Sequence, residues 1–252
     1  MTQVPDYIER RIRQPIPPGL CVVPGSTPVV AFGNARTAKV ATIGLNPSSN
    51  EFQDRSGQDL VGCFRRLATH RSLGVCDLTI APSATIAQVL KESNAYFQRN
   101  PYEWFNQLEP ILKACGASYC DGSACHLDLV QWATKPTWNS LDTNAKRRLL
   151  DADAQFLREQ LSNENFELLL VNGSGVACPL QKMFDTEFKE LCLDELGPIP
   201  GFGKNRTRLF TGSVLSKVRI VAWNVNLQSP YGVTPELKAA LAERVAQLAK
   251  ES

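Results

Sequence analysis

Asn46 is the first residue in this chain whose type and position could do chemistry. It follows the apolar, β-branched run 39–45 and precedes Pro47, which makes the turn rigid. Ligands of open α/β sheets bind at the carboxyl ends of strands, so a polar side chain delivered there is a candidate catalytic group. A neutral amide deprotonates water poorly, but it can position a water molecule through its carbonyl and amide groups.

Three further segments have the same form, an apolar run that leads into polar or small residues and then into a turn or helix. They are 125–134, 170–176 and 222–233. Because parallel strands present their carboxyl ends at one edge of a sheet, we expect all four segments to meet there.

Short apolar runs alternate with helical patterns along the chain. The expected strands are 39–45, 124–130, 167–171 and 218–223, and their continuous apolar character is typical of a parallel sheet covered on both faces. The expected helices are 101–115, 143–161, 176–188 and a last helix that opens with Thr234-Pro235-Glu236. The alternation predicts an α/β fold with a mostly parallel sheet in a single domain, 1–252. We expect an arm without regular structure at 1–37 and an insertion at 53–100.

The composition is that of an ordinary globular protein, with 43% hydrophobic residues, 21% charged residues and a formal net charge of +2. Nucleic-acid binding would therefore need a local basic face. The N-terminal segment lacks the apolar core of a signal peptide, and no apolar run is long enough to span a membrane. The eight cysteines are irregularly spaced, without Cys-x-x-Cys. We expect a cytoplasmic protein with free, mostly buried thiols.

The turn Gly44-Leu45-Asn46-Pro47 resembles the first active-site motif of the uracil-DNA glycosylase superfamily, in its Gly-x-Asn-Pro form. The loop Leu227-Gln228-Ser229-Pro230 is similar to the family's second motif in its place after the last strand and in its Ser-Pro ending. The resemblance implies a three-layer α/β/α sandwich around a four-stranded sheet and hydrolysis of a base–sugar bond by a water that Asn46 positions. It also implies that Asn46 and the Ser229-Pro230 loop face one another across a cleft that holds a nucleobase.

The remaining roles follow from this resemblance. Phe52, with Phe64 as the alternative, is the expected stacking face for the flipped base, and Asp128 is expected to bind its edge. Gly44, Leu45 and Pro47 would line the base pocket. The expected DNA contacts are Ser174, Gly175, Lys204, Arg206, Arg208, Gln228, Ser229, Pro230 and Tyr231. The three basic residues among them are assigned from the glycine-rich, basic composition of their loop, and a solvated charged loop stays open as the alternative. We expect a monomer that acts on single- or double-stranded DNA, without a cofactor or metal.

Two departures from the family pattern affect the expected substrate. Leu227 stands where many members have a histidine that stabilises the departing base, and Asn224 or Asn226 could donate a hydrogen bond instead. Asp128 replaces a base-binding amide, and an ionised carboxylate only accepts hydrogen bonds. It would suit a base edge that carries an amino group. Uracil, hypoxanthine and modified cytosine all stay open as targets, as do DNA repair and defence against phage.

Other interpretations of these residues stay open as well. The chain could be a non-catalytic nucleic-acid-binding protein, or a hydrolase of small molecules or nucleosides. A surface role for Glu51, in a helix cap or paired with Arg55, is at least as plausible as a role in the site. His126 and Asp128 would need a third ligand to hold zinc, and Ser174 lacks the Gly-x-Ser-x-Gly pattern of a hydrolase nucleophile.

Overall fold

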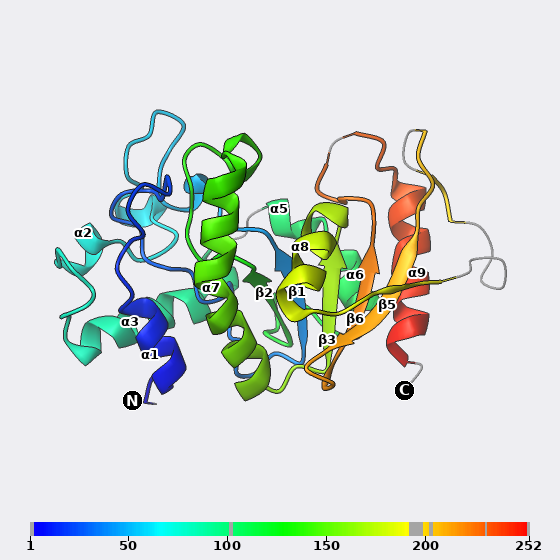
Figure 1. Ribbon diagram of the computed structural model, residues 1–252, viewed down its shortest axis with the longest axis horizontal. Helices are drawn as coiled ribbons and strands as arrows, with labels where there is room; N and C mark the ends of the chain where they lie inside the picture. The colour runs from blue at the N-terminus through cyan, green and yellow to red at the C-terminus, as the bar shows by residue number, and fades with distance from the viewer. Residues whose placement is uncertain (1–2, 101–102, 192–198, 202–203, 230, 251–252) are drawn as a thin grey trace. The chain divides into compact units, whose positions relative to one another are not determined.

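The computed structural model describes residues 3–100, 103–191, 199–201, 204–229 and 231–250 (Figure 1). The chain divides into two compact units, each built from three separate segments. The first unit comprises Met1–Asn34, Leu45–Asn100 and Leu127–Asn163. The second unit comprises Ala35–Gly44, Pro101–His126 and Glu164–Ser252.

The sheet is mixed but mostly parallel, and in the described residues it has six strands in the order β2-β1-β3-β6-β5-β4. The parallel pairs β1–β3 and β3–β6 place Ile43 beside Val171 and Val171 beside Ala222, so these three strands end at the same level. The strand bounds are β1 Val40–Gly44, β2 Ala124–Asp128, β3 Leu168–Asn172, β4 Lys189–Glu190, β5 Leu209–Val214 and β6 Val218–Trp223.

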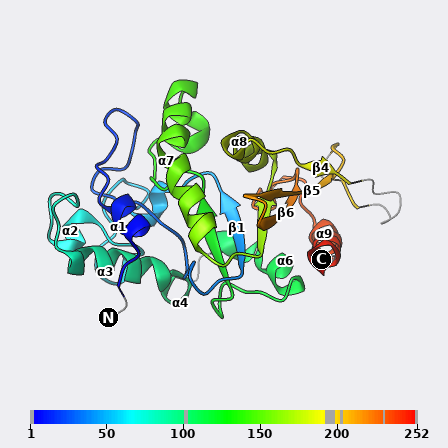
Figure 2. The same cartoon turned by 60° about the horizontal axis from the view of Figure 1, so that its bottom comes forward.

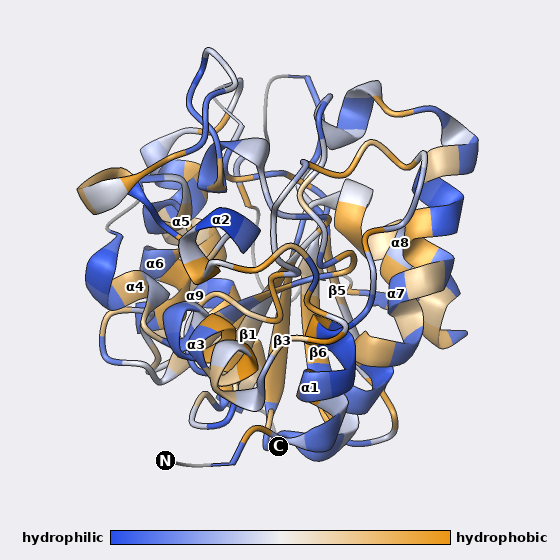
Figure 3. Cartoon of the chain, turned by 90° about the vertical axis from the view of Figure 1, so that its left-hand side faces the viewer, coloured by the Kyte–Doolittle hydropathy of each residue, from blue (hydrophilic) through white to orange (hydrophobic). Residues whose placement is uncertain are grey.

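Helices cover both faces of the sheet in the second unit. Helix α8 (Ser174–Phe184) lies on one face, and α6 (Glu109–Ala114) and α9 (Pro235–Lys250) pack together on the other (Figure 2). The parallel strands β1, β3 and β6 are mostly hydrophobic, as expected when both faces are buried (Figure 3). The Thr234 hydroxyl accepts a hydrogen bond from the Leu237 amide and caps α9.

The core of the first unit lies among three helices, α1 (Asp6–Ile12), α3 (Ser83–Asn94) and α7 (Thr143–Asn163). The short elements of this unit are α2 (His70–Leu73), α4 (Tyr96–Arg99) and the 3₁₀ turns η1 (Ser49–Glu51), η2 (Gly62–Phe64) and η3 (Trp138–Ser140). The remaining helix, α5 (Glu103–Asn106), belongs to the second unit.

The structure corrects several expectations. Over the described residues the sheet has six strands rather than four, because β4 and β5 join as an antiparallel extension beyond β6. The expected arm contains helix α1, since Tyr7, Ile8 and Ile12 bury one helical face. Helix α8 ends at Phe184 rather than at residue 188. The next residue, Asp185, adopts a left-handed conformation that ends the helix.

The cysteines also differ from expectation. Of the seven described, all are free, but only Cys125 is buried, and five are exposed: Cys21, Cys63, Cys76, Cys120 and Cys178. Within the described part of the chain, no helix combines the length and apolar character that a membrane crossing requires.

Candidate active site

The candidate residues fall into two groups, one in each unit. Asn46, Pro47, Phe52 and Asp128 lie in the first unit, and the expected DNA contacts lie in the second. The predicted cleft would need Asn46, in the first unit, and the Ser229-Pro230 loop, in the second unit, and Pro230 lies outside the described residues. This cleft stays a prediction.

The side chain of Asn46 is fixed by its own amide group. Its Nδ2 donates to the backbone oxygen of Trp132 at 3.2 Å and to Oγ1 of Thr134 at 3.1 Å, as well as to the oxygen of Pro47. A backbone carbonyl can only accept, so the Nδ2 end of the amide must face Trp132. Oδ1 is therefore the end of the amide that is directed away from these partners, and it is an acceptor for water.

The Asn46 turn is attached to the segment after β2 by backbone contacts. The Val130 amide donates to the oxygen of Leu45 at 2.9 Å, and Ser48 forms a parallel bridge with Thr134. The Ser48 hydroxyl also caps η1 by accepting from the amide of Asn50. The turn that carries Asn46 is thus held at both ends. Gly44 and Leu45 are half-buried, and Pro47 is buried.

Glu51 does not have the surface role that the sequence left open for it. It is 2% exposed, and its Oε2 accepts a 2.7 Å hydrogen bond from the hydroxyl of Tyr96. Its ionic neighbour is Arg66, at 3.5 Å from Oε1, rather than Arg55. The pKa of Glu51 is raised to about 7. Burial is the largest cause, the hydrogen bond from Tyr96 and the charge of Arg66 lower the pKa, and the negative charge of Asp128 raises it. A carboxyl group that titrates near neutral pH is a feature that functional sites often contain.

Asp128 ends β2 and is 6% exposed. The loop that follows is held by a buried ion pair, because Oδ2 of Asp153 accepts from both the Arg11 guanidinium, at 2.8 Å, and the Gln131 amide, at 2.7 Å. The Gln131 side chain in turn donates to the backbone oxygen of Asp128 at 2.8 Å. The position of Asp128 therefore depends on an ion pair that lies outside the expected site.

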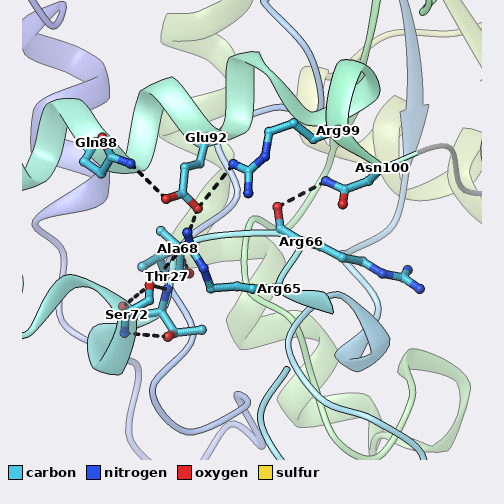
Figure 4. Close-up of polar contacts among 10 residues, drawn as sticks. Thr27, Arg65, Arg66, Ala68, Ser72, Gln88, Glu92, Arg99 and Asn100 are labelled. Atoms are coloured by element: carbon cyan, nitrogen blue, oxygen red, sulfur yellow. Dashed lines mark hydrogen bonds and ion pairs between the residues drawn. The ribbon is translucent and has the colours of Figure 1, made fainter. Parts of the chain in front are cut away.

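The two candidate stacking residues differ in exposure. Phe52 is 2% exposed, so a base could stack on its ring only after neighbouring side chains move. Phe64, on η2, is 75% exposed. The two arginines that follow Phe64 each contact a buried glutamate of the first unit. Arg65 donates to Glu92 at 2.6 Å, and Arg66 lies 3.5 Å from Glu51. Glu92 is 3% exposed and also lies 3.9 Å from Arg99 (Figure 4). These contacts indicate a structural role for the basic pair.

In the second unit, the buried amide of Asn172 holds the loop after β6. Its Oδ1 accepts from Trp223 Nε1 at 2.9 Å and from the amide of Leu227 at 3.0 Å. Its Nδ2 donates to Oδ1 of Asn226 at 2.9 Å and to Oε1 of Gln228 at 3.0 Å. All four hydrogen-bonding positions of this amide are used. Asn172 was not among the predicted site residues. Its position at the end of an apolar strand is similar to that of Asn46, which follows an apolar strand.

The two candidate replacements for the motif histidine are now distinguishable. Asn224 uses both ends of its amide, because Oδ1 accepts from the amide of Arg208 at 2.8 Å and Nδ2 donates to the oxygen of Arg206 at 2.9 Å. Asn226 accepts through Oδ1 from the amide of Gln228 at 3.0 Å and from Nδ2 of Asn172 at 2.9 Å, so Nδ2 is the end of its amide opposite to these two donors. Asn226 is exposed, so its donor is the better placed of the two to meet a ligand. Leu227 is 1% exposed and belongs to the core.

The other expected DNA contacts in the second unit are at the surface. Ser174 and Gly175 are exposed at the start of α8, where Ser174 lies against the oxygen of Asn224 at 3.4 Å. Gly173, before them, has φ +93°, and a Cβ there would meet the backbone of Asn226 at 3.4 Å. Exposed side chains are also found at Lys204, Arg206, Arg208 and Tyr231, whereas Gln228 and Ser229 are half-buried.

No three His, Cys, Asp or Glu side chains in the described residues gather into a group that could hold a metal ion. No protein-family model matches the chain, and no curated protein matches it in sequence.

Proposed function

We propose that this chain is a monofunctional DNA glycosylase on a uracil-DNA glycosylase-like fold, which hydrolyses the N-glycosidic bond of a flipped uracil-like, damaged or modified base. The observation that carries the proposal is the orientation of Asn46. With Nδ2 engaged by Trp132 and Thr134, Oδ1 is available to accept a hydrogen bond from a water molecule. That bond would direct an oxygen lone pair of the water toward the sugar.

In the proposed reaction, the bond between C1′ and the base nitrogen breaks, and its electron pair leaves with the base. The water oxygen then forms a bond to C1′ and loses a proton to solvent. Asn46 contributes by positioning, which lowers the entropic part of the barrier. The Nδ2 donor of Asn226 would stabilise the negative charge on the departing base, in place of the motif histidine. Asp128 would accept from an amino group on the base edge.

A second candidate function is a non-catalytic nucleic-acid-binding protein on the same fold. The observation that favours it is the burial of Leu227, because a core leucine at the place of the motif histidine supplies no hydrogen-bond donor. Such a protein would keep the exposed basic residues of the second unit without turnover.

Oligonucleotides that each carry one uracil, hypoxanthine or modified cytosine test the proposal. Strand scission after alkali treatment reports the abasic product, and we expect it with at least one of these bases. Binding without abasic product across the whole set would contradict the glycosylase and favour the binding protein. Activity on free nucleosides, without salt-dependent DNA affinity, would instead indicate a small-molecule hydrolase.

A further inference from the structure

Trp104 is the most exposed tryptophan among the described residues. Its exposed fraction is 45%, whereas Trp132 and Trp223 are 1% exposed and Trp138 is half-buried. The next residue, Phe105, is buried, and its ring lies edge-on to His126 with centroids 5.0 Å apart. Helix α5 is therefore anchored through Phe105 while it presents the indole of Trp104 to solvent.

The backbone of Trp104 is tied to the loop after β6. Its oxygen accepts from Nε2 of Gln228 at 3.1 Å, and Oε1 of the same side chain accepts from Asn172. The backbone of helix α5 at Trp104 is thus linked, through Gln228, to Asn172 at the end of the central strand β3. A second exposed aromatic residue follows on this loop, since Tyr231 is 84% exposed and its amide donates to the hydroxyl of Ser229.

Two arginines lie beside Asn224, at the start of the same loop. Arg206 and Arg208 are exposed, and both are held by their backbones to the side chain of Asn224. Arg208 also lies 3.5 Å from Glu190, but both partners are about half exposed, and such pairs are weak. A phosphate group can compete for these guanidinium groups.

We propose that Trp104, Gln228, Tyr231 and the basic residues Lys204, Arg206 and Arg208, here named the aromatic–basic surface, bind an unpaired DNA strand whose bases stack on Trp104. In a duplex, both faces of each base are covered by its neighbours, so an exposed indole finds a stacking partner only where a base is unpaired. The cations meet the phosphates without regard to sequence. The inference rests on the proposed function for the choice of DNA, and it adds a preference for single strands.

Binding of the full-length chain to a fluorescently labelled oligo-dT 12-mer, compared with a duplex of the same length, tests the proposal. We expect tighter binding to the single strand, together with quenching of tryptophan fluorescence. W104A should weaken single-strand binding about 5- to 150-fold, which is the range for loss of one stacked base. W104F retains an aromatic face and should bind close to wild type. W138F, in the other unit, is the matched control and should retain the quenching.

The electrostatic part has its own measurement. R206Q and R208Q should each reduce the slope of log Kd against log salt concentration by about 0.7 for a single strand. The backbone contacts of both residues with Asn224 do not depend on their side chains.

Wild-type affinity in W104A, with an unchanged urea midpoint, would overturn the proposal, and so would duplex binding as tight as single-strand binding. Base release is not part of this assay. A chain that prefers single strands but releases no base would retain the aromatic–basic surface and refute the glycosylase. A chain that releases a base but does not prefer single strands would refute this inference and leave the glycosylase proposal in place.

Discussion

Replacement of Glu51 by glutamine should make the unfolding free energy less dependent on pH. Burial raises the pKa of Glu51 from 4.5 to about 7. Between these values the folded state keeps the proton that the unfolded state releases, so wild-type stability falls as pH rises through this window. The side chain is 2% exposed, so solvent screening does not reduce the effect. From pH 5 to pH 8, the unfolding free energy of the wild-type chain falls by about 2–3 kcal/mol through this group.

Glutamine carries no titrating proton, and its Oε1 can still accept from Tyr96. We therefore expect E51Q to gain about 2–3 kcal/mol relative to wild type between pH 5 and pH 8, as measured by urea unfolding followed by tryptophan fluorescence. E243Q, which alters an exposed glutamate on α9, is the matched control and should show no such gain. If the difference between E51Q and wild type were the same at both pH values, Glu51 would not be the buried titrating group described above.

Three further predictions concern the groups that position the candidate site. D153N should destabilise the chain by about 3–5 kcal/mol in urea unfolding, because it leaves Arg11 buried without its ionic partner, whereas E159Q, in an exposed pair with Arg10, should cost less than about 1 kcal/mol. N172L should cost roughly 2–4 kcal/mol and speed hydrogen exchange at Trp223 Nε1, since this donor and the Leu227 amide lose their acceptor; unchanged exchange would contradict the network. D128N should shift the ratio of turnover toward uracil over modified cytosine, because an amide can donate as well as accept; an unchanged ratio would exclude Asp128 from base recognition.

The parts of the fold that could be predicted from sequence are those with strong local signals. The continuous apolar runs identified β1, β2, β3 and β6 within two residues at either end. Helix α9 was predicted from its Thr-Pro-Glu start and α7 from its apolar periodicity. Strand β5 was missed because its Leu-Phe-Thr-Gly-Ser-Val sequence contains a glycine and is only partly buried. The signal there was local but weak.

The parts that could not be predicted depend on contacts between residues far apart in sequence. A surface role for Glu51, in a helix cap or beside Arg55, was left open with a role in the site, but Glu51 is buried and contacts Tyr96 and Arg66, which lie 45 and 15 residues away. The choice between Asn224 and Asn226 likewise rests on which backbone groups reach their amides. No local pattern in the sequence encodes these pairings, because they arise only when separate loops pack together.

The central claim is that the amide of Asn46 positions the water that releases a base. Single-turnover base release by N46A and by N50A, which alters an exposed amide on the same turn and leaves its backbone contact with Ser48 in place, tests this claim most directly. With the oligonucleotide that wild type cleaves best, we predict that N46A loses about 10²-fold or more in rate, as expected when a positioning group is removed, while N50A stays near wild type. Equal rates for N46A and wild type would contradict the assignment.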